Sequence, residues 1–272
     1  MAEPAQIDGS GSTRARCILA PNPSLMTLDG TNTWLVAEPS SPRVIVIDPG
    51  PADEEHLQRI CAVVAERDQR VAAIVLTHRH ADHSAGAPRL AELTGAAVRA
   101  VDPLHRLGSE GLSAGDVLDS AGCELRVIET PGHTSDSVSL QIPADGVVLT
   151  GDTVLGRGTA VIADDGSLTD YLDSLRRLRA LADATGLRQL LPGHGPLLAD
   201  PAGVLDYYLA HRAERLDEVR AALAAGDSDP ASIVARVYVD VDRALWVFAE
   251  SSVRAQLRYL ADHGEVPPGV TW

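Results

Sequence analysis

The sequence predicts an α/β fold of buried strands and amphipathic helices, and three observations support this prediction. The run from Val71 to Leu76 is apolar at every position, which is typical of a strand buried on both faces. Segments with apolar residues at helical spacing lie between several such runs. Clusters of histidine, aspartate and glycine follow the runs, where open α/β folds build their sites. The 272 residues suffice for one large or two modest domains with a real core.

The N-terminal part of the chain is expected to supply strands and the helices that flank them. Residues 1–15 are small and polar, and we expect them to be disordered. Residues 32–37 and 44–48 are typical of a pair of strands. Apolar residues at helical spacing over 53–66 predict a helix on the outside of the fold, and another is expected over about 88–93.

Later strands are expected at 125–128, 147–150 and 189–191, with a helix starting near Thr169. The segment 156–166 is rich in glycine and is a candidate for substrate contacts, although a plain connection is an equal alternative.

After Pro196 the pattern becomes helical. Asp200-Pro201 and Asp229-Pro230 each place an N-cap before a proline in the first helical position, and a third helix is expected from about Arg243 to Leu260. Residues 265–272 are expected to form a short wing. We therefore predict a larger α/β domain over 16–199 and a small helical, winged-helix-like domain over 200–272.

The densest motif, Thr77-His78-Arg79-His80-Ala81-Asp82-His83, directly follows the strand expected at 71–76. Placing several imidazoles and a carboxylate this close together costs free energy unless a cation binds them. One residue of separation lets His78 and His80 bind a single ion, while Asp82 and His83 follow the turn toward a second. A solvated loop without function is the alternative, and the partners downstream argue against it.

Three motifs downstream supply further candidate ligands. They are His133 in Pro-Gly-His-Thr, Asp152 in Thr-Gly-Asp-Thr and His194 in Pro-Gly-His-Gly. Each ends or follows an apolar run and has an adjacent glycine, which allows the backbone to approach a metal closely. Singly each motif is typical of a turn, but together they indicate a metal site.

In this order the motifs resemble those of the metallo-β-lactamase fold of binuclear hydrolases, over about 32–196. The resemblance implies an αββα sandwich with two Zn²⁺ ions, or other divalent metals, at one edge of two facing sheets. The implied ligands are His78, His80 and His133 for the first ion, Asp82, His83 and His194 for the second, and Asp152 bridging both.

Asp48, in Ile-Asp-Pro-Gly, matches the aspartate of the family's first motif, which holds a ligand histidine from the second shell. That role is physically reasonable because a ligating imidazole needs an acceptor for its other N–H. An ordinary turn at a strand end is an equal alternative.

The implied mechanism is hydrolysis by a hydroxide that bridges the two metals. Asp82 is expected to orient this hydroxide and accept its proton. An iron-dependent oxidation of the persulfide type usually leaves the ligands of the second site unused, and this sequence contains all of them.

The motif Gly30-Thr31-Asn32-Thr33, residues 155–159 and the helical tail resemble the β-lactamase-like protein 2 group. The mitochondrial members of that group are implicated as endoribonucleases on single-stranded RNA, so endoribonuclease-like phosphodiester hydrolysis is the first expectation. The net charge of −15 opposes it, as do seven arginines against eleven acidic residues over 201–272. Thioester hydrolysis of the glyoxalase II type is the alternative, with weak β-lactamase side activity possible in principle. A metal-free binding module is the alternative outside enzymes.

Composition sets the expected location and partners. The N-terminus lacks a basic region followed by an apolar stretch, and the three cysteines are far apart, which favours a cytoplasmic protein with reduced thiols. No apolar run approaches the ~20 residues needed to span a bilayer, so no membrane partner is expected. The expected partner is a small-molecule ester or thioester, or single-stranded RNA. The sequence leaves the oligomeric state open.

Overall fold

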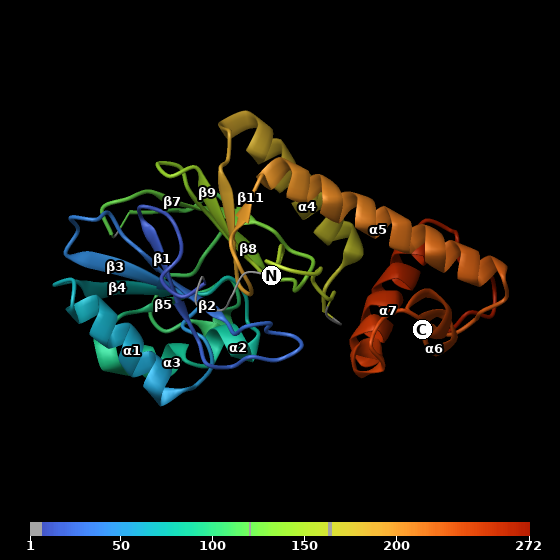
Figure 1. Cartoon of the computed structure of the whole chain (residues 1–272), viewed down its shortest axis with the longest axis horizontal. Helices are drawn as coiled ribbons and strands as arrows, with labels where there is room; N and C mark the ends of the chain where they lie inside the picture. Colours follow the sequence, from blue (N-terminus) through green and yellow to red (C-terminus); the bar gives the residue numbers. More distant parts are fainter. Residues whose placement is uncertain (1–6, 120, 163–164) are drawn as a thin grey trace.

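The computed structural model describes residues 7–119, 121–162 and 165–272, and it has two β-sheets facing each other with helices on both outer surfaces (Figure 1). The first sheet has the strand order β1-β2-β3-β4-β5, and the second has the order β11-β10-β9-β8-β7-β6. The predicted αββα sandwich is confirmed. The strands of the first sheet are β1 (Ala15–Leu19), β2 (Asn32–Val36), β3 (Arg43–Ile47), β4 (Arg70–Val75) and β5 (Val98–Arg99).

The second sheet is antiparallel except for its parallel pair β9 and β10. Its strands are β6 (Val117–Leu118), β7 (Leu125–Glu129), β8 (Val138–Ile142), β9 (Val147–Gly151), β10 (Gln189–Pro192) and β11 (Leu198–Ala199). The strands β1, β6, β8 and β11 were not predicted from the sequence. Of these, β8 alternates apolar and polar residues, yet all its residues are buried between its neighbours.

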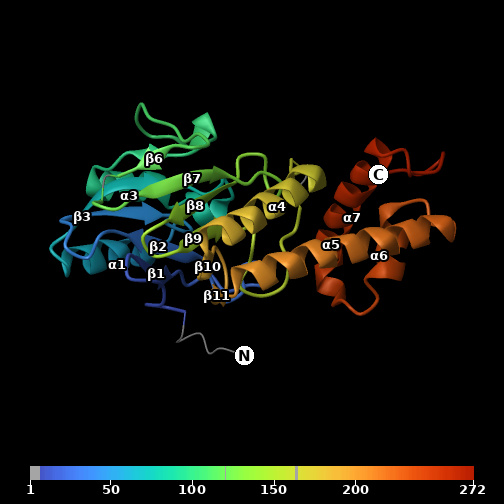
Figure 2. The same ribbon diagram turned by 90° about the horizontal axis from the view of Figure 1, so that it is seen from above.

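Helices cover the two outer surfaces of the sandwich. Helices α1 (Glu54–Ala65) and α3 (Ala87–Thr94) lie on the first sheet, whereas α4 (Leu168–Thr185) and α5 (Pro201–Ala224) lie side by side on the second (Figure 2). Short side chains cap the N-termini of α1, α4 and α5. At α1, for example, Asp53 accepts a hydrogen bond from the backbone N–H of His56, at 2.8 Å. Two short helices, α2 (Ala81–Ser84) and the 3₁₀ helix η2 (Pro103–His105), lie in the connections.

The C-terminal helices pack around the far end of α5, at the right of Figure 1. They are α6 (Pro230–Val237), the 3₁₀ turn η3 (Arg243–Leu245) and α7 (Trp246–Asp262). As the Asp-Pro pairs predict, Asp200 and Asp229 cap α5 and α6, and their prolines lie in the first turn. No strand in the described part of the chain follows Ala199, so residues 265–272 do not form the expected wing as a strand.

Two hydrophobic cores result from the alternation of side chains along the central strands. Val147 and Leu149 of β9 point between the two sheets, whereas Val148 points toward the helices on the outer face. Likewise, Leu191 of β10 points between the two sheets and Leu190 points toward the helices. The second core continues into α5, α6 and α7, so the C-terminal helices share it with the sandwich.

The N-terminal segment differs from the expectation of disorder over 1–15. Residues 1–6 lie outside the described residues, but Ile7 is buried in the first core. The backbone N–H of Gly9 donates to the carbonyl of Cys17 at 2.9 Å, and Arg14 pairs with Glu38 and Asp145. These contacts order residues 7–14. Among the described residues, no helix has the length and apolarity that crossing a bilayer requires.

Candidate metal centre

Four connections that follow strands converge at one edge of the sandwich. His78 and His80 follow β4, and Asp82 and His83 lie on α2 directly after them. The other three connections follow β7, β9 and β10. They contribute, in order, His133, Asp152 and His194. The structure therefore brings all seven sequence-predicted residues together.

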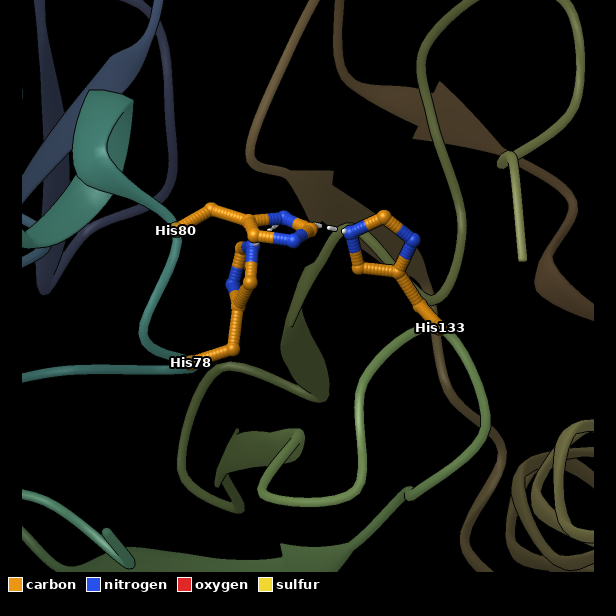
Figure 3. A group of neighbouring side chains, drawn as sticks. All are labelled: His78, His80 and His133. Carbon is orange, nitrogen blue, oxygen red and sulfur yellow. Dashed lines mark hydrogen bonds between the residues drawn. The ribbon is translucent and has the colours of Figure 1, made fainter. Parts of the chain in front are cut away.

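The first cluster consists of His78, His80 and His133, whose rings face one another (Figure 3). His80 Nδ1 lies 3.1 Å from His78 Nε2 and 3.0 Å from His133 Nε2. Two ligands of a tetrahedral Zn²⁺ with Zn–N bonds of 2.0–2.1 Å are about 3.3 Å apart. The three nitrogens thus have nearly the spacing of ligands on one ion.

The second cluster consists of Asp82, His83 and His194. His194 Nε2 lies 3.1 Å from both His83 Nε2 and Asp82 Oδ2, and His83 Nε2 lies 3.5 Å from Asp82 Oδ2. Two nitrogens and one carboxylate oxygen at these separations form a donor set that suits Zn²⁺.

Asp152 lies between the two clusters. Its Oδ1 is 3.4 Å from His83 Nε2, and its Oδ2 is 3.4 Å from His194 Nε2 and 3.8 Å from His133 Nε2. Oδ1 is buried and has no hydrogen-bond partner among the described residues, an arrangement that a cation would satisfy. A Cβ on Gly193 would lie 2.5 Å from this oxygen, which explains the glycine before His194. Both clusters and the orphaned oxygen fit divalent metal ions.

Contacts behind the histidines fix which ring nitrogen faces the cluster. His83 Nδ1 lies 2.9 Å from Asp48 Oδ2, and His133 Nδ1 lies 2.6 Å from the carbonyl of Val161. His194 Nδ1 lies 3.2 Å from the carbonyl of Gly30. Because these oxygens accept the Nδ1–H, each Nε2 keeps its lone pair for a metal. Asp48 therefore holds His83, one of the candidate ligands, in position.

The electrostatics of the two clusters differ. Burial, followed by the neighbouring histidines, lowers the pKa of His78 and brings the pKa of His80 to about 4, so these rings are neutral. Burial alone would also lower the pKa of His194, but Asp152 and Asp82 raise it to about 9. The same competition, with Asp152 and Asp48, raises the pKa of His83. Metal binding at the second cluster therefore displaces protons.

Comparison with known proteins agrees with this geometry. Residues 26–194 match the family model described as the metallo-beta-lactamase superfamily. The chain belongs to this superfamily. Residues 230–267, which span α6, η3 and α7, match a beta-lactamase associated winged helix domain.

Relatives of this metallo-β-lactamase chain carry several names. A beta-lactamase-like protein 2 homolog of Caenorhabditis elegans is 31% identical over 258 residues, which cover 92% of this chain and 84% of that protein. An atrochrysone carboxyl ACP thioesterase of Aspergillus fumigatus is 34% identical over 69% of this chain and 58% of that protein. The crystal structure of a beta-lactamase domain protein from Burkholderia ambifaria superimposes with a TM-score of 0.80 at 24% identity, covering 99% of this chain and 94% of the other.

Two supporting residues of the metallo-β-lactamase domain were not assigned a role from the sequence. Asn32 Nδ2 donates to the carbonyls of Pro192 and Gly195, both at 2.9 Å, and so fixes the loop of His194. The Thr77 hydroxyl lies 3.0 Å from His78 Nδ1 and donates to Asp48 at 2.6 Å. The places of these two residues in the sequence could have indicated their supporting roles. Asn32 stands in the Gly-Thr-Asn-Thr motif, and Thr77 immediately precedes the histidine cluster.

A cleft of about 410 Å³ opens beside the metallo-β-lactamase centre. His133 and Asp152 line it, as does the segment 157–161. Residues of the loop at 25–28 and of α5 and α7 also line it. The segment expected to provide substrate contacts therefore does line a cleft, together with residues of the C-terminal helices.

Proposed function

We propose that this protein is a metal-dependent hydrolase of small-molecule acyl thioesters or esters. The observation that carries the proposal is the cleft: it leads to His133 and Asp152, and its walls are largely apolar. Its volume of about 410 Å³ lies in the range of small-molecule sites. The thioesterase name of the Aspergillus fumigatus relative supports the same reaction class.

We further propose two Zn²⁺ ions, one held by His78, His80 and His133 and one by Asp82, His83 and His194, with Asp152 shared. When bound, the metals would lower the pKa of a water between them and polarise the substrate carbonyl. The donor set and the orphaned oxygen of Asp152 support this assignment.

The residues of the chain have distinct roles in the proposed reaction. The side chain of Asp82 is 31% exposed, more than those of His83 and His194, so one carboxylate oxygen can accept a proton from the attacking water while the other faces the cluster. His133 is held by Val161, a residue of the cleft wall, so the same segment positions a ligand and the substrate. The apolar walls exclude water from the bound acyl group.

Cleavage of single-stranded RNA is the second candidate. The basic residues Arg157, His211 and Arg215 line the cleft, which suits an anionic substrate, but Asp29 pairs with Arg157 and Glu218 pairs with Arg215. A longer phosphate track is not supported by the arginines of α4, because Arg176 pairs with Asp173 and Arg179 pairs with Asp206. Nucleic-acid channels combine a positive groove with stacking aromatics over several nucleotides, whereas this cleft is short.

One experiment separates the two candidates. A single zinc-loaded preparation is given an acyl thioester of N-acetylcysteamine and a labelled single-stranded RNA, and each assay is repeated with Asp82→Ala. We expect thioester turnover that Asp82→Ala reduces by at least about a hundredfold, as loss of a general base does. The control is Asp217→Ala, an exposed aspartate on α5 that pairs with Arg220. RNA cleavage lost in Asp82→Ala, without thioester turnover, would refute the thioester proposal in favour of a nuclease.

The metal assignment has its own measurement. Elemental analysis of the purified protein is expected to give two zinc ions per chain, and His80→Ala is expected to reduce this number. A single iron per chain would instead indicate oxidation chemistry, and a protein without metal would indicate a binding module.

A further inference from the structure

Arg212 of α5 is a buried cation for which the described residues provide no counter-ion. The residue is 3% exposed and lines the cleft. One of its terminal nitrogens donates to the carbonyl of Ala160, and its guanidinium lies 4.9 Å from the ring centroid of Tyr171. Its Nε has no hydrogen-bond partner, and no carboxylate of the described chain forms an ion pair with it. Burying a charge in this way is costly unless an anion compensates it.

Other buried polar groups without a hydrogen-bond partner among the described residues belong to α5 and α7, whose residues line the cleft. His211 lines the cleft next to Arg212, and its Nδ1 is buried without a partner. Ser252 of α7 also lines the cleft, and the amide of Gln256, one helical turn further, has no partner for its nitrogen or its oxygen. Arg215 differs, because Glu218 binds it at 2.7 Å. The unmatched donors therefore centre on Arg212.

Apolar side chains form much of the remaining cleft wall. Leu155 and Val161 come from the metallo-β-lactamase domain, and Val241, Leu245 and Phe248 come from the C-terminal helices. A ligand that fills this cleft thus meets the metal ligands His133 and Asp152, an apolar wall and the guanidinium of Arg212. An acyl group with a charged end matches this combination.

We propose that Arg212 binds a carboxylate on the acyl group of the substrate, at the end remote from the scissile carbonyl. The inference rests on the proposed thioester or ester hydrolysis and narrows its substrates to half-esters and half-thioesters of dicarboxylic acids. A planar guanidinium suits a carboxylate, which can accept two parallel hydrogen bonds from it. Helix α5, which leads from the sandwich to the winged-helix-associated residues 230–267, thereby contributes to specificity.

A structural role for Arg212, holding the loop at Ala160, is the competing explanation. The two roles predict different responses to ligand charge. A structural arginine affects charged and uncharged ligands equally, whereas an anion-binding arginine affects only the charged ones.

The first test measures binding without turnover. The zinc-loaded full chain is titrated calorimetrically with 6-oxoheptanoate, a ketone that cannot be hydrolysed, and with the uncharged 2-octanone. We expect Arg212→Gln to weaken the binding of 6-oxoheptanoate at least about tenfold, as loss of a charged hydrogen bond does, and to leave the binding of 2-octanone unchanged. Arg220→Gln, an arginine of α5 paired with Glu265 outside the cleft, is the matched control.

The second test measures turnover of adipyl and hexanoyl thioesters of N-acetylcysteamine. We expect the parent protein to prefer the adipyl substrate, and Arg212→Gln to raise the KM for that substrate alone. Thermal unfolding of Arg212→Gln and of the charge-preserving Arg212→Lys shows whether the variants fold. If Arg212→Gln does not fold, Arg212→Lys decides the proposal: loss of the bidentate guanidinium should weaken binding of 6-oxoheptanoate and leave 2-octanone unchanged, whereas a carboxylate held by the metals would bind as before.

Several outcomes would overturn the inference. The parent protein could bind both ketones with equal affinity, or Arg212→Gln could weaken the binding of both ketones equally. Binding of 6-oxoheptanoate that is unchanged in Arg212→Gln would place the carboxylate on the metals. Binding of methyl phosphate in place of 6-oxoheptanoate would also overturn the carboxylate assignment. Charge-selective binding without any thioester turnover would refute the proposed function and leave the anion site standing.

Discussion

Asp48 connects both halves of the metal centre through one carboxylate. Its oxygens accept hydrogen bonds from the backbone N–H of Thr77 at 2.7 Å and from the Thr77 hydroxyl, which in turn contacts His78. The same carboxylate contacts His83 Nδ1 at 2.9 Å. Asp48 has a left-handed backbone with φ of 50°, and the Thr33 hydroxyl donates to its carbonyl at 2.7 Å. One histidine of each cluster therefore depends on the position of Asp48.

The first prediction concerns the substitution Asp48→Asn. An amide in this place presents an N–H₂ group where the carboxylate accepted hydrogen bonds, so it cannot serve both Thr77 and His83. We expect metal affinity to fall by about 10- to 100-fold, the usual effect of losing such a supporting contact. Competition with a chromogenic chelator measures the affinity, with Asp217→Asn as control. Unchanged affinity in Asp48→Asn would show that the histidines are oriented without it.

The second prediction concerns His56, which is 2% exposed and lies 3.0 Å from the Thr33 hydroxyl through its Nε2. Burial, followed by the charge of Arg59, lowers its pKa to about 4. Because the folded protein resists protonating this ring and the unfolded chain does not, stability is lost as the pH falls from the unfolded pKa of about 6.5 toward 4. Between pH 7 and pH 5 the loss amounts to about 2 kcal/mol.

Urea unfolding of the metal-free protein at these two pH values checks the prediction for His56. His56→Gln should reduce the pH dependence by this amount, whereas His263→Gln, which changes an exposed histidine, should not. An equal pH dependence in parent and His56→Gln would mean that other groups cause it.

At the scale of elements, the loop of His133 is held against α4 by a close contact. Gly132 has φ of 134°, and a Cβ on it would lie 2.3 Å from the Cα of Tyr171 in α4. The backbone N–H of Ser167, the N-cap of α4, donates to the carbonyl of Gly132 at 3.0 Å. The start of α4 therefore sets the position of a metal ligand.

The third prediction compares two glycine substitutions. Gly132→Ala must push the His133 loop away from α4, so we expect it to destabilise the fold and to lower the metal content of the purified protein. Gly158 has φ of 70°, but a Cβ added to it would meet open space. Gly158→Ala should therefore lower the free energy of unfolding only by the backbone strain of about 1 kcal/mol. Urea unfolding and elemental analysis measure both effects. Full metal content in Gly132→Ala would show that the loop adapts without loss of the site.

Much of the fold and of the candidate site was predictable because the decisive signals are local. Long apolar runs and Asp-Pro caps mark their own elements, and the metal candidates stand in short motifs beside glycines. The roles of Thr77 and Asn32 were not predictable, because each depends on contact with a segment distant in sequence. The short strands β6 and β11 have two residues each, too few for a periodic pattern. The sequence also does not show that Arg212 is buried, because its burial results from packing between α4 and α5.

For the whole molecule, the second sheet joins the two cores. Neighbouring residues of β9 and β10 point into opposite cores, and the outer core reaches through α5 to α7. Loss of either core therefore removes packing from the same strands. The C-terminal helices cannot separate from the sandwich without exposing buried residues such as Leu205 and Val253, which are both 0% exposed.

The last prediction follows from this shared sheet and from the metal centre. We expect the zinc-loaded protein to unfold in a single calorimetric transition, with equal calorimetric and van't Hoff enthalpies. Chelation should lower its midpoint, because the metal binds the folded chain: free metal at a hundredfold excess over Kd contributes about 2.7 kcal/mol, or roughly 5–10 °C for a chain of this size. The transition should stay single after chelation, since the cores remain joined. Two separated transitions, with the lower one assigned to the C-terminal helices, would show that these helices unfold independently of the sandwich.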